Sequence, residues 1–548
     1  MREARYALGV DYGTNSVRAL IADTATGAEV GTAVWEYARG EAGVWLRIGD
    51  PHLARQHPQD YIDGFFACVR GALADAGVDP RAIVGIGVDT TGSTPLPLDA
   101  HGVPLALDPR FAENVDAMAW LWKDHTAYAE AAEITALSRT RGEPYLAKCG
   151  GTYSSEWFWS KLLRCARVAP DVFAAAYTWV EAQDFIPAWL CGVRKPEEIA
   201  RGACAAGHKA MFHRAWGGLP SAEFLGALDP RLADLRGRLY DGVATIGTSA
   251  GGLDPSIAEQ VGLPAGIPIS VGAMDAHLGA VGSGVRPGTL VKIMGTSTCD
   301  ILVGDASTPD IPGVCGVAEG SVLPGMLGIE AGQSAVGDLF HWGATKLGAR
   351  GHGALTDEAV RLAPGQSGLM ALDWNNGNRT VLVDPLLTGL LVGQTLHTTS
   401  GEIYRALIEA TAFGARTIIE RIRENGVPID EIVVCGGIAE KSPLTMQIYA
   451  DVCEMPLKAA RSGQACALGA AICGAVAGGA HPDVGSAVAA MAGVKAAVFE
   501  PKQAHQAVYR SLYGVYQTLH DAFGVPGTRS DVSGVMKELG RIRLQGVE

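Results

Sequence analysis

The sequence lacks the motifs that mark several large classes of protein. Its 11 cysteines form no C-x-x-C pair, and none lies at zinc-ligand spacing from histidines, which argues against a zinc domain or a disulfide scaffold. No G-x-x-x-x-G-K-[ST] motif occurs, and no G-x-G-x-x-G opens an early helix, so the P-loop and Rossmann fingerprints are absent. We therefore expect buried, reduced thiols, and any nucleotide site must be built in another way.

Positive charge and long apolar runs are also scarce. The net charge is −14 at pH 7 and no polybasic block occurs, so we expect neither nucleic acid nor a membrane as a partner. The most apolar stretch, residues 465–480, is too short to span a bilayer and predicts a buried helix. The chain enters a strand pattern at Tyr6 with no signal-peptide pattern before it, so we expect a cytoplasmic protein.

The composition is that of a folded chain with several domains. The 548 residues predict three or four domains at about 150 residues each. Apolar residues make up 48% and charged residues 19%, which excludes a disordered chain. The 71 glycines indicate many tight turns or close approaches of the backbone to a ligand.

Two pairs of segments repeat one another along the chain. Residues 6–23 and 290–305 both have an apolar strand, a Gly-Thr turn with small polar residues and a second apolar strand, which predicts a β-hairpin. Residues 82–96 and 431–444 both have a short buried strand that ends in a glycine-containing loop. Because the two matches occur in the same order, they favour a duplicated domain.

Strand patterns alternate with helical ones. Residues 399–423 carry one apolar face at helical spacing, and alternation of this kind indicates α/β lobes. The turn-rich segment 282–288 predicts the domain boundary. We expect an N-terminal lobe over residues 1–284, a C-terminal lobe over 285–501 with a cleft between the two, and a closing helix with a polar tail over 502–548.

The turns of the two predicted hairpins are suited to phosphate. In the first turn, Asp11 can hold Mg²⁺ directly or through water, and Gly13 lets the backbone approach a phosphate closely. Thr14 and Asn15 can donate hydrogen bonds to phosphate oxygens. A plain hairpin turn is the alternative.

The second turn, Gly295 and Thr296 followed by a serine, repeats the pattern of the first. Two such turns from two lobes would face each other across a nucleotide, which favours the phosphate interpretation. Gly436 and Gly437 stand before a helix that begins at about Leu444, and a backbone without Cβ atoms suits an adenine ring or a phosphate.

Two further loops are polar where a buried strand ends. Asp275 follows a glycine-containing strand and opens a helix of small residues, so it is either a plain N-cap or a general base. The loop over residues 89–95 is rich in hydroxyls and includes Gly92 and Ser93, so it is either a turn or one wall of a polar pocket.

These residues together resemble the FGGY carbohydrate kinases, a family of the hexokinase, actin and Hsp70 superfamily. The match covers residues 5–480, and within the family the chain looks most like the L-ribulokinases. The segments that carry this likeness are residues 87–95, 121–126, 150–157, 206–210 and 330–338.

The resemblance implies two ribonuclease-H-like α/β lobes and ATP-dependent phosphorylation of the terminal hydroxyl of a ketopentose. It implies that Asp275 is the base, that both turns and Asp11 handle Mg²⁺ and phosphates, and that Gly436 and Gly437 lie along the adenosine. For the sugar it implies the residues Gly92, Ser93, Trp122, Lys209, Asp275 and Glu330. A solvated Lys209 and a core Trp122 remain as alternatives.

The expected activity is therefore phosphorylation of L-ribulose at C5 in L-arabinose catabolism, with ATP and Mg²⁺ as co-substrate and cofactor. D-ribulose and xylulose are the alternative substrates, and a non-transferring ATPase or sugar-responsive regulator of the same superfamily is the alternative class. No helix-turn-helix or basic segment precedes Tyr6, which argues against a regulator. The oligomeric state stays open, with a homodimer as one alternative.

Overall fold

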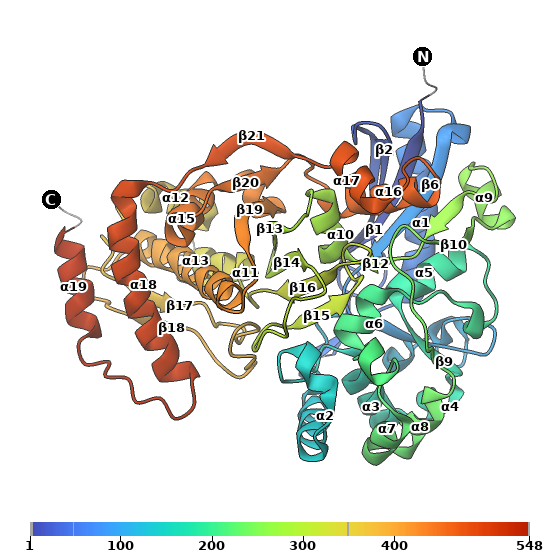
Figure 1. Ribbon diagram of the computed structural model, residues 1–548, viewed down its shortest axis with the longest axis horizontal. Coiled ribbons are helices and arrows are strands. Elements are labelled where there is room, and N and C mark those ends of the chain that lie inside the picture. Colours follow the sequence, from blue (N-terminus) through green and yellow to red (C-terminus); the bar gives the residue numbers. More distant parts are fainter. Residues whose placement is uncertain (1–3, 48, 348–349, 546–548) are drawn as a thin grey trace.

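The structure, a computed structural model, describes residues 4–47, 49–347 and 350–545. It has two lobes, each built around a seven-stranded sheet (Figure 1). The N-terminal sheet consists, in spatial order, of β10 (Ser249–Gly252), β11 (Pro268–Ser270), β6 (Ile83–Thr90), β1 (Tyr6–Tyr12), β2 (Ser16–Asp23) and β3 (Glu29–Glu36), with β12 (Ala273–Met274) also paired to β6. The C-terminal sheet consists of β15 (Gly316–Glu319), β16 (Leu327–Ala331), β14 (Thr298–Gly304), β13 (Gly288–Met294), β19 (Ile429–Cys435), β20 (Leu457–Ala460) and β21 (Val494–Phe499).

The two sheets share one topology, as the repeated segments predict. β1 and β2 form an antiparallel hairpin, and β1 also pairs in parallel with β6. In the second lobe β13 and β14 form the hairpin, and β13 pairs in parallel with β19. The predicted α/β class with two related lobes, the arrangement of the actin and hexokinase type, is therefore confirmed.

Two helices lie between the sheets and join the lobes (Figure 1). α10 (Asp275–Gly282) packs against α16 (Ala465–Ala477), and α16 packs across β1 and β6 although it follows the C-terminal strands in the chain. The predicted buried helix over 465–480 is thus confirmed. Glycines bring the backbones together, because a Cβ on Gly87 would lie 1.8 Å from the carbonyl oxygen of Ala470, and one on Gly469 would lie 1.9 Å from that of Leu278.

Replacing Gly469 by alanine should destabilise the protein by about 1–3 kcal/mol, because the new methyl has no room beside α10. The matched control is Gly514→Ala in the interior of α18 (Gln503–Gly524), where a Cβ would meet nothing within 4 Å. That control should gain about 0.5–1 kcal/mol from helix propensity alone. Thermal unfolding midpoints measured at one scan rate test the pair, and equal midpoints would contradict the close packing of α10 on α16.

A mostly helical region is inserted in the N-terminal lobe between β6 and β10, at the lower right of Figure 1. Its own core contains Trp120, Trp159 and Trp179, all buried. This region carries Trp122 and Lys209. The elements of this region are β7 (Pro95–Leu98), β8 (Ala119–Trp120), α2 (Tyr128–Arg141), α3 (Phe158–Val168), α4 (Pro170–Ala175), β9 (Thr178–Glu181), α5 (Ala182–Leu190), α6 (Ala203–Lys209), α7 (Ala222–Leu228) and α8 (Pro230–Arg236). The same lobe also contains β4 (Trp45–Arg47), β5 (Asp50–Gln56) and α1 (Pro58–Ala76), which precede β6 in the chain, and α9 (Pro255–Val261), which follows β10.

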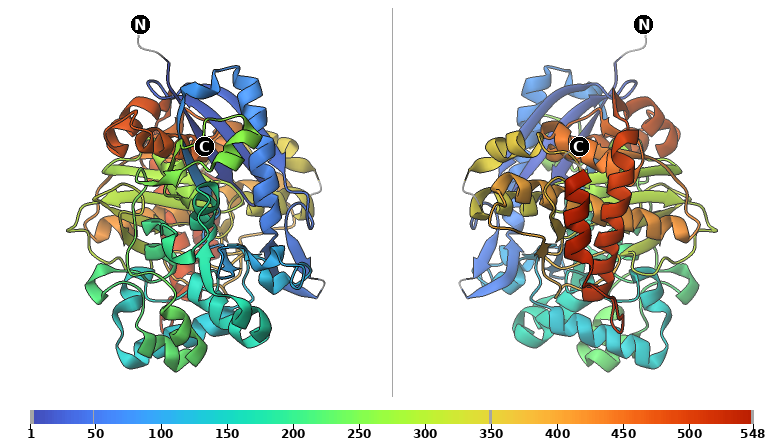
Figure 2. Two further views of the ribbon diagram at one scale, coloured as in Figure 1. Left: turned by 90° about the vertical axis from the view of Figure 1, so that its right-hand side faces the viewer. Right: turned by 90° about the vertical axis from the view of Figure 1, so that its left-hand side faces the viewer.

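The C-terminal lobe is covered by long helices. The predicted helix over residues 399–423 is α13 (Ser400–Glu424), which begins with a capping box between Thr399 and Glu402. The predicted closing helix is α18, but the segment after it is not only a polar tail, because it forms α19 (Val535–Gln545), whose Leu539 and Ile542 are buried. Figure 2 shows α18 and α19 side by side in red. The remaining elements of this lobe are α11 (Gly337–Trp342), α12 (Gly351–Ala359), β17 (Met370–Leu372), β18 (Leu390–Val392), α14 (Gly437–Lys441), α15 (Pro443–Cys453) and α17 (Val484–Met491).

Within the described part of the chain, none of the helices combines the length and the apolar composition that crossing a bilayer requires.

Candidate functional site

Two carboxyl groups lie side by side where β1 and β6 end. Asp11 and Asp89 are partners in the parallel register, and Asp89 is completely buried. Neither carboxylate oxygen of Asp89 accepts a hydrogen bond from an N–H or hydroxyl group of the described residues, and its near neighbour is the carboxyl group of Asp11. Burial and the neighbouring Asp11 raise the pKa of Asp89 well above its usual range. Unpartnered carboxylate oxygens of this kind suit a hard divalent cation such as Mg²⁺.

The first hairpin turn joins β1 to β2 and is tied to the helical insertion. The Gly13 N–H donates to the Ser16 carbonyl at 2.9 Å, which closes the turn. The indole N–H of Trp122 donates to the Thr14 hydroxyl at 3.0 Å, so a predicted sugar residue contacts a predicted phosphate residue. The amide of Asn15 donates to the Ala42 carbonyl at 2.5 Å, so this predicted donor is already engaged by the protein.

The second hairpin turn lies against the glycine pair. Gly436 has φ of 100°, and a Cβ on it would lie 2.4 Å from the carbonyl oxygen of Met294, directly before Gly295. A residue with a Cβ would be strained at this φ and would clash with the Met294 carbonyl, so the position requires glycine. Gly295 and Thr296 are exposed, and Gly437 has open space where its Cβ would be. The structure therefore brings together the four predicted residues on the nucleotide side.

Asp275 lies beside the acidic pair. β12 pairs with the end of β6, and this pairing places Asp275 next to the strand that carries Asp89. Asp275 is the first residue of α10, and its carboxylate accepts the N–H of Ala276 at 2.7 Å, whereas the N-cap position is Met274. Burial, followed by the charge of Asp11, raises the pKa of Asp275 to about 7. A carboxyl group with a pKa near the working pH is suited to act as a general base.

Lys209 and Glu330 form an ion pair across the two lobes. The Lys209 ammonium donates to both carboxylate oxygens of Glu330, at 2.7 and 2.9 Å. Their exposed fractions are only 5% and 7%, so Lys209 is not a solvated surface cation. Although burial opposes it, the charge of Lys209 holds the pKa of Glu330 well below its usual range. The pair offers a fixed donor and a fixed acceptor, as recognition of a polyol requires.

The Gly92–Ser93 loop is held in a strained conformation. Ser93 has φ of 42°, a region that non-glycine residues rarely adopt. The buried ammonium of Lys161 donates to the carbonyls of Ser93 at 2.7 Å and Leu121 at 2.9 Å, so it fixes both this loop and the segment before Trp122. Gly92 lies against Met274, directly before Asp275, since a Cβ on Gly92 would lie 3.0 Å from the Met274 sulfur.

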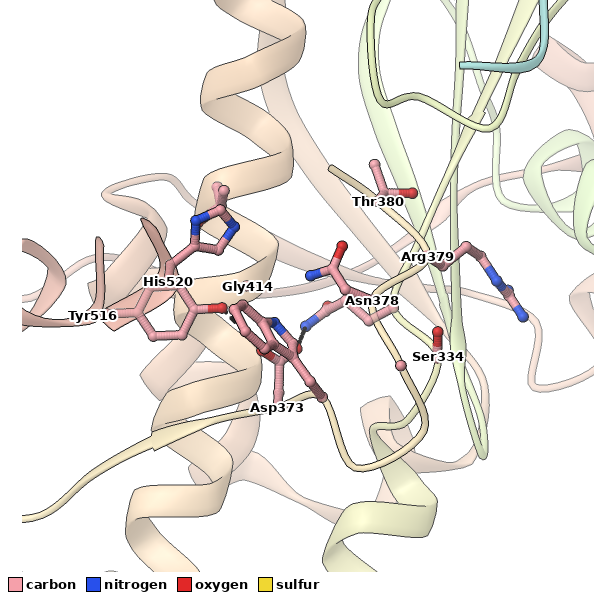
Figure 3. Close-up of a pocket in the computed structure, with 12 residues that line it drawn as sticks. Ser334, Asp373, Asn378, Arg379, Thr380, Gly414, Tyr516 and His520 are labelled. Atoms are coloured by element: carbon pink, nitrogen blue, oxygen red, sulfur yellow. Dashed lines mark hydrogen bonds between the residues drawn. The ribbon is translucent and has the colours of Figure 1, made fainter. Parts of the chain in front are cut away.

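Another interlobe ion pair was not expected from the sequence. Arg379 lies 3.5 Å from Glu156, which belongs to the helical insertion. Figure 3 shows the Arg379 side chain directed away from the small pocket that its neighbours line. The sequence analysis missed Lys161, Glu156 and Arg379, because no motif surrounds them. The signal in the sequence was only that Glu156 falls within the segment 150–157.

The pocket of Figure 3 belongs to a polar network inside the C-terminal lobe. The carboxylate of Asp373 accepts from the Tyr516 hydroxyl of α18 at 2.9 Å and from the Gln333 amide at 2.8 Å. The cavity measures about 10 Å³, which is room for one water molecule. The network links α18 to the segment that follows Glu330, so the closing helix supports the site from behind.

Comparisons with known proteins identify the family of the chain. Residues 6–282 match the N-terminal domain and residues 290–478 the C-terminal domain of the FGGY family of carbohydrate kinases. The chain is 41% identical to a ribulokinase of Shouchella clausii over 99% of both chains. It is 42% identical to a ribulokinase of Mycolicibacterium smegmatis over 95% of this chain and 94% of that one.

Solved structures show the same fold at lower identity. The xylulose kinase of Rhodospirillum rubrum superposes with a TM-score of 0.78 at 24% identity, covering 94% of this chain and 99% of that one. The glycerol kinase of Plasmodium falciparum, solved with ADP, superposes with a TM-score of 0.76 at 14% identity, covering 94% of this chain and 98% of that one.

Proposed function

The chain belongs to the FGGY family of carbohydrate kinases and is an ATP-dependent sugar kinase; on that premise we propose that it phosphorylates the C5 hydroxyl of L-ribulose in L-arabinose catabolism. The observation that carries the proposal is the buried Lys209–Glu330 pair, whose charges act on Asp275. A donor, an acceptor and a base meet there. Relatives that are 41% identical to this chain over nearly its full length are ribulokinases.

The proposed reaction is a direct in-line transfer. The C5 oxygen of the sugar attacks the γ-phosphorus of ATP, the bond from that phosphorus to the β,γ-bridging oxygen breaks, and ADP leaves. The proton of the C5 hydroxyl passes to the carboxylate of Asp275. Lys209, Glu330 and the Gly92–Ser93 loop hold the sugar, and Trp122 packs against its apolar face.

The two hairpin turns hold the phosphates in this proposal. Gly13 and Thr14 contribute from the first turn, and Gly295 and Thr296 from the second. Asn15 contributes its backbone N–H, because its side-chain amide already donates to Ala42. Gly436 and Gly437 lie along the adenosine. Water must be excluded, because a site open to solvent would hydrolyse ATP, and the Lys209–Glu330 and Arg379–Glu156 ion pairs hold the lobes together at the sugar side.

Asp11 and Asp89 would hold Mg²⁺, directly or through water. The fit rests on their register across β1 and β6 and on the unpartnered oxygens of Asp89. The bound ion would neutralise charge that develops on the phosphate oxygens.

The proposal is tested by ADP release from purified protein with Mg²⁺–ATP and L-ribulose, D-ribulose, D-xylulose, L-xylulose or glycerol. We expect the highest kcat/KM with L-ribulose, because the relatives act on ribulose and one hydroxyl can separate pentose epimers in a site that hydrogen-bonds it. Phosphate located at C5 of the product by NMR completes the test. If another polyol gives the highest value, the substrate assignment falls; if no sugar raises ADP release above basal hydrolysis, the kinase proposal itself falls.

A further inference from the structure

The first hairpin turn is held from one side by a buried side chain of another strand. Gln56 is the last residue of β5 and is 1% exposed. Its amide nitrogen donates to the Thr14 carbonyl at 2.8 Å and to the Gly13 carbonyl at 3.3 Å. The partners are 42 and 43 residues away in the chain, so these bonds are not part of the hairpin itself. The proposed phosphoryl transfer has so far given Gln56 no role.

The neighbours of Gln56 fix the orientation of its amide. Backbone carbonyls only accept hydrogen bonds, so the NH₂ group must face the turn and the oxygen must face away from it. That oxygen accepts from the Tyr61 hydroxyl of α1 at 2.7 Å, and Tyr61 is itself 2% exposed. The amide therefore cannot rotate without losing three hydrogen bonds.

The two carbonyls that Gln56 holds determine where two N–H groups point. The peptide bonds from Gly13 to Thr14 and from Thr14 to Asn15 are both trans. In a planar trans peptide the C=O and the N–H point in opposite directions. Because the carbonyls of Gly13 and Thr14 point to Gln56, the N–H groups of Thr14 and Asn15 point away from it.

These two N–H groups are unpaired. Neither the Thr14 N–H nor the Asn15 N–H donates a hydrogen bond to a group in the part of the chain that the structure describes. Thr14 is half-buried and Asn15 is exposed, so both are open to a ligand. The Asn15 carbonyl is held as well, since it accepts from the Tyr37 N–H at 2.9 Å. Successive backbone N–H groups with a fixed common direction are suited to bind an anion.

We propose that Gln56 is a positioning residue for the nucleotide: by holding the Gly13 and Thr14 carbonyls, it presents the N–H groups of Thr14 and Asn15 to the phosphates of ATP. Tyr61 acts one step further back, because it fixes the amide of Gln56. Neither side chain touches the nucleotide in this proposal. The identity of the ligand rests on the proposed function, whereas the orientation of the turn does not.

The benefit of this arrangement is preorganisation. A turn whose carbonyls were free could rotate its peptide planes, and the binding of phosphate would then have to fix them. Donors that are already fixed avoid that cost. Loss of Gln56 should therefore weaken the binding of nucleotide and leave the binding of sugar at Lys209 and Glu330 unchanged.

Gln56→Met tests this expectation, because methionine has a similar length and no N–H donor. Calorimetry with Mg²⁺–ATP should give a Kd raised about tenfold or more, since the N–H groups are no longer held in place. The KM for ATP should rise in parallel, with the KM for L-ribulose unchanged. The matched control is Gln366→Met in the C-terminal lobe, where the amide oxygen accepts from the Ala363 N–H at 2.8 Å. A merely structural role would lower the unfolding midpoint without separating the two KM values.

Tyr61→Phe is the milder variant, because it keeps the ring and removes only the hydroxyl. The Kd for Mg²⁺–ATP should rise less than in Gln56→Met, because the amide of Gln56 can still reach the turn but is no longer fixed. The control is Tyr145→Phe in the helical insertion, whose hydroxyl accepts from the Ser221 N–H at 3.1 Å. Wild-type affinity in folded Gln56→Met would overturn the proposal. If that variant does not fold, wild-type affinity in Tyr61→Phe would overturn it.

The N–H of Asn15 can also be followed directly in the wild-type protein. Labelling with ¹⁵N at the backbone of asparagine gives few signals, because the chain has only six asparagines. The Asn15 signal, assigned by its loss in Asn15→Ser, should move downfield with Mg²⁺ and a non-hydrolysable ATP analogue but not with L-ribulose. An Asn15 signal that does not respond to the nucleotide would contradict the proposal.

The outcomes separate this role from the proposed function. If Mg²⁺–ATP binds in a manner that depends on Gln56 but no sugar raises ADP release, the proposed function fails and the positioning role stands. If L-ribulose is phosphorylated and folded Gln56→Met binds ATP as the wild type does, the positioning role fails and the proposed function stands.

Discussion

Asp275→Asn should lower kcat for the sugar by about 10²–10⁴-fold, the range that a positioned general base contributes. The amide cannot accept the proton of the C5 hydroxyl, while the shape of the side chain is unchanged. Steady-state ADP release with saturating L-ribulose and ATP measures the effect. Turnover within a few-fold of wild type would remove Asp275 from the role of base.

A lost helix cap would not imitate this result. The N-cap position of α10 is Met274, so Asp275→Asn removes no capping side chain, and the amide oxygen can still accept the Ala276 N–H; the variant should keep the wild-type unfolding midpoint. The matched control is Asp254→Asn, at the N-cap of α9, where the side chain accepts from the Ser256 N–H at 2.9 Å. Both variants should fold equally well, and only Asp275→Asn should lose turnover.

The same residue predicts the pH dependence of the wild-type enzyme. Because burial and Asp11 raise the pKa of Asp275 to about 7, the base is protonated as the pH falls through that value. The kcat/KM for the sugar should therefore decline about tenfold per pH unit below about pH 7. In Asp275→Asn this acid limb should be missing from the residual activity; a limb that persists there would belong to another group.

Lys209→Met should lower kcat/KM for L-ribulose by about 100-fold or more and also destabilise the protein. A hydrogen bond to a charged group contributes about 1.5–3 kcal/mol, and the variant leaves Glu330 buried without its partner, at 7% exposure. Breaking a buried ion pair on one side costs about 3–5 kcal/mol of folding free energy. Steady-state kinetics and thermal unfolding midpoints measure the two effects.

The double variant Lys209→Met/Glu330→Met separates stability from function. Replacing both charges by apolar groups of similar size removes the unpaired charge, so the unfolding midpoint should recover while phosphorylation of L-ribulose stays low. Arg405→Met is the matched control, because Arg405 pairs with Glu409 at 2.8 Å in α13, also buried and outside the proposed site. It should lose stability with the KM for the sugar unchanged. Recovery of sugar phosphorylation in the double variant would contradict a binding role for the pair.

Much of the candidate site was predictable from short segments. The two hairpins, α13 and α16 were all expected, because strand alternation, turn residues and helical periodicity act between residues close in sequence. The assignment of roles within the site came instead from the resemblance to a family. The roles of Asp275, Lys209 and Glu330 stay predictions until the variants above are measured.

Local patterns failed where two segments meet only in the folded chain. Only a polar tail was expected after the closing helix, yet α19 forms there, because Leu539 and Ile542 pack into the apolar core of the C-terminal lobe. Asn15 was expected to face a phosphate with its side chain, yet that amide donates to Ala42, 27 residues away. Neither partner can be read from the neighbouring residues.

The sequence by itself determined the class of the fold and the repeated hairpin-and-strand unit, and it pointed to the turns that we propose bind phosphate, because these features depend on residues close together in the chain. Only the tertiary structure decided that Lys209 meets Glu330, 121 residues apart, and that Arg379 meets Glu156. It also decided that His208 and His277 lie buried beside the Glu330 carboxylate. The burial of a charge or a lone pair depends on all the residues that pack around it. Those residues come from both lobes, so they meet only when the lobes pack against α10 and α16.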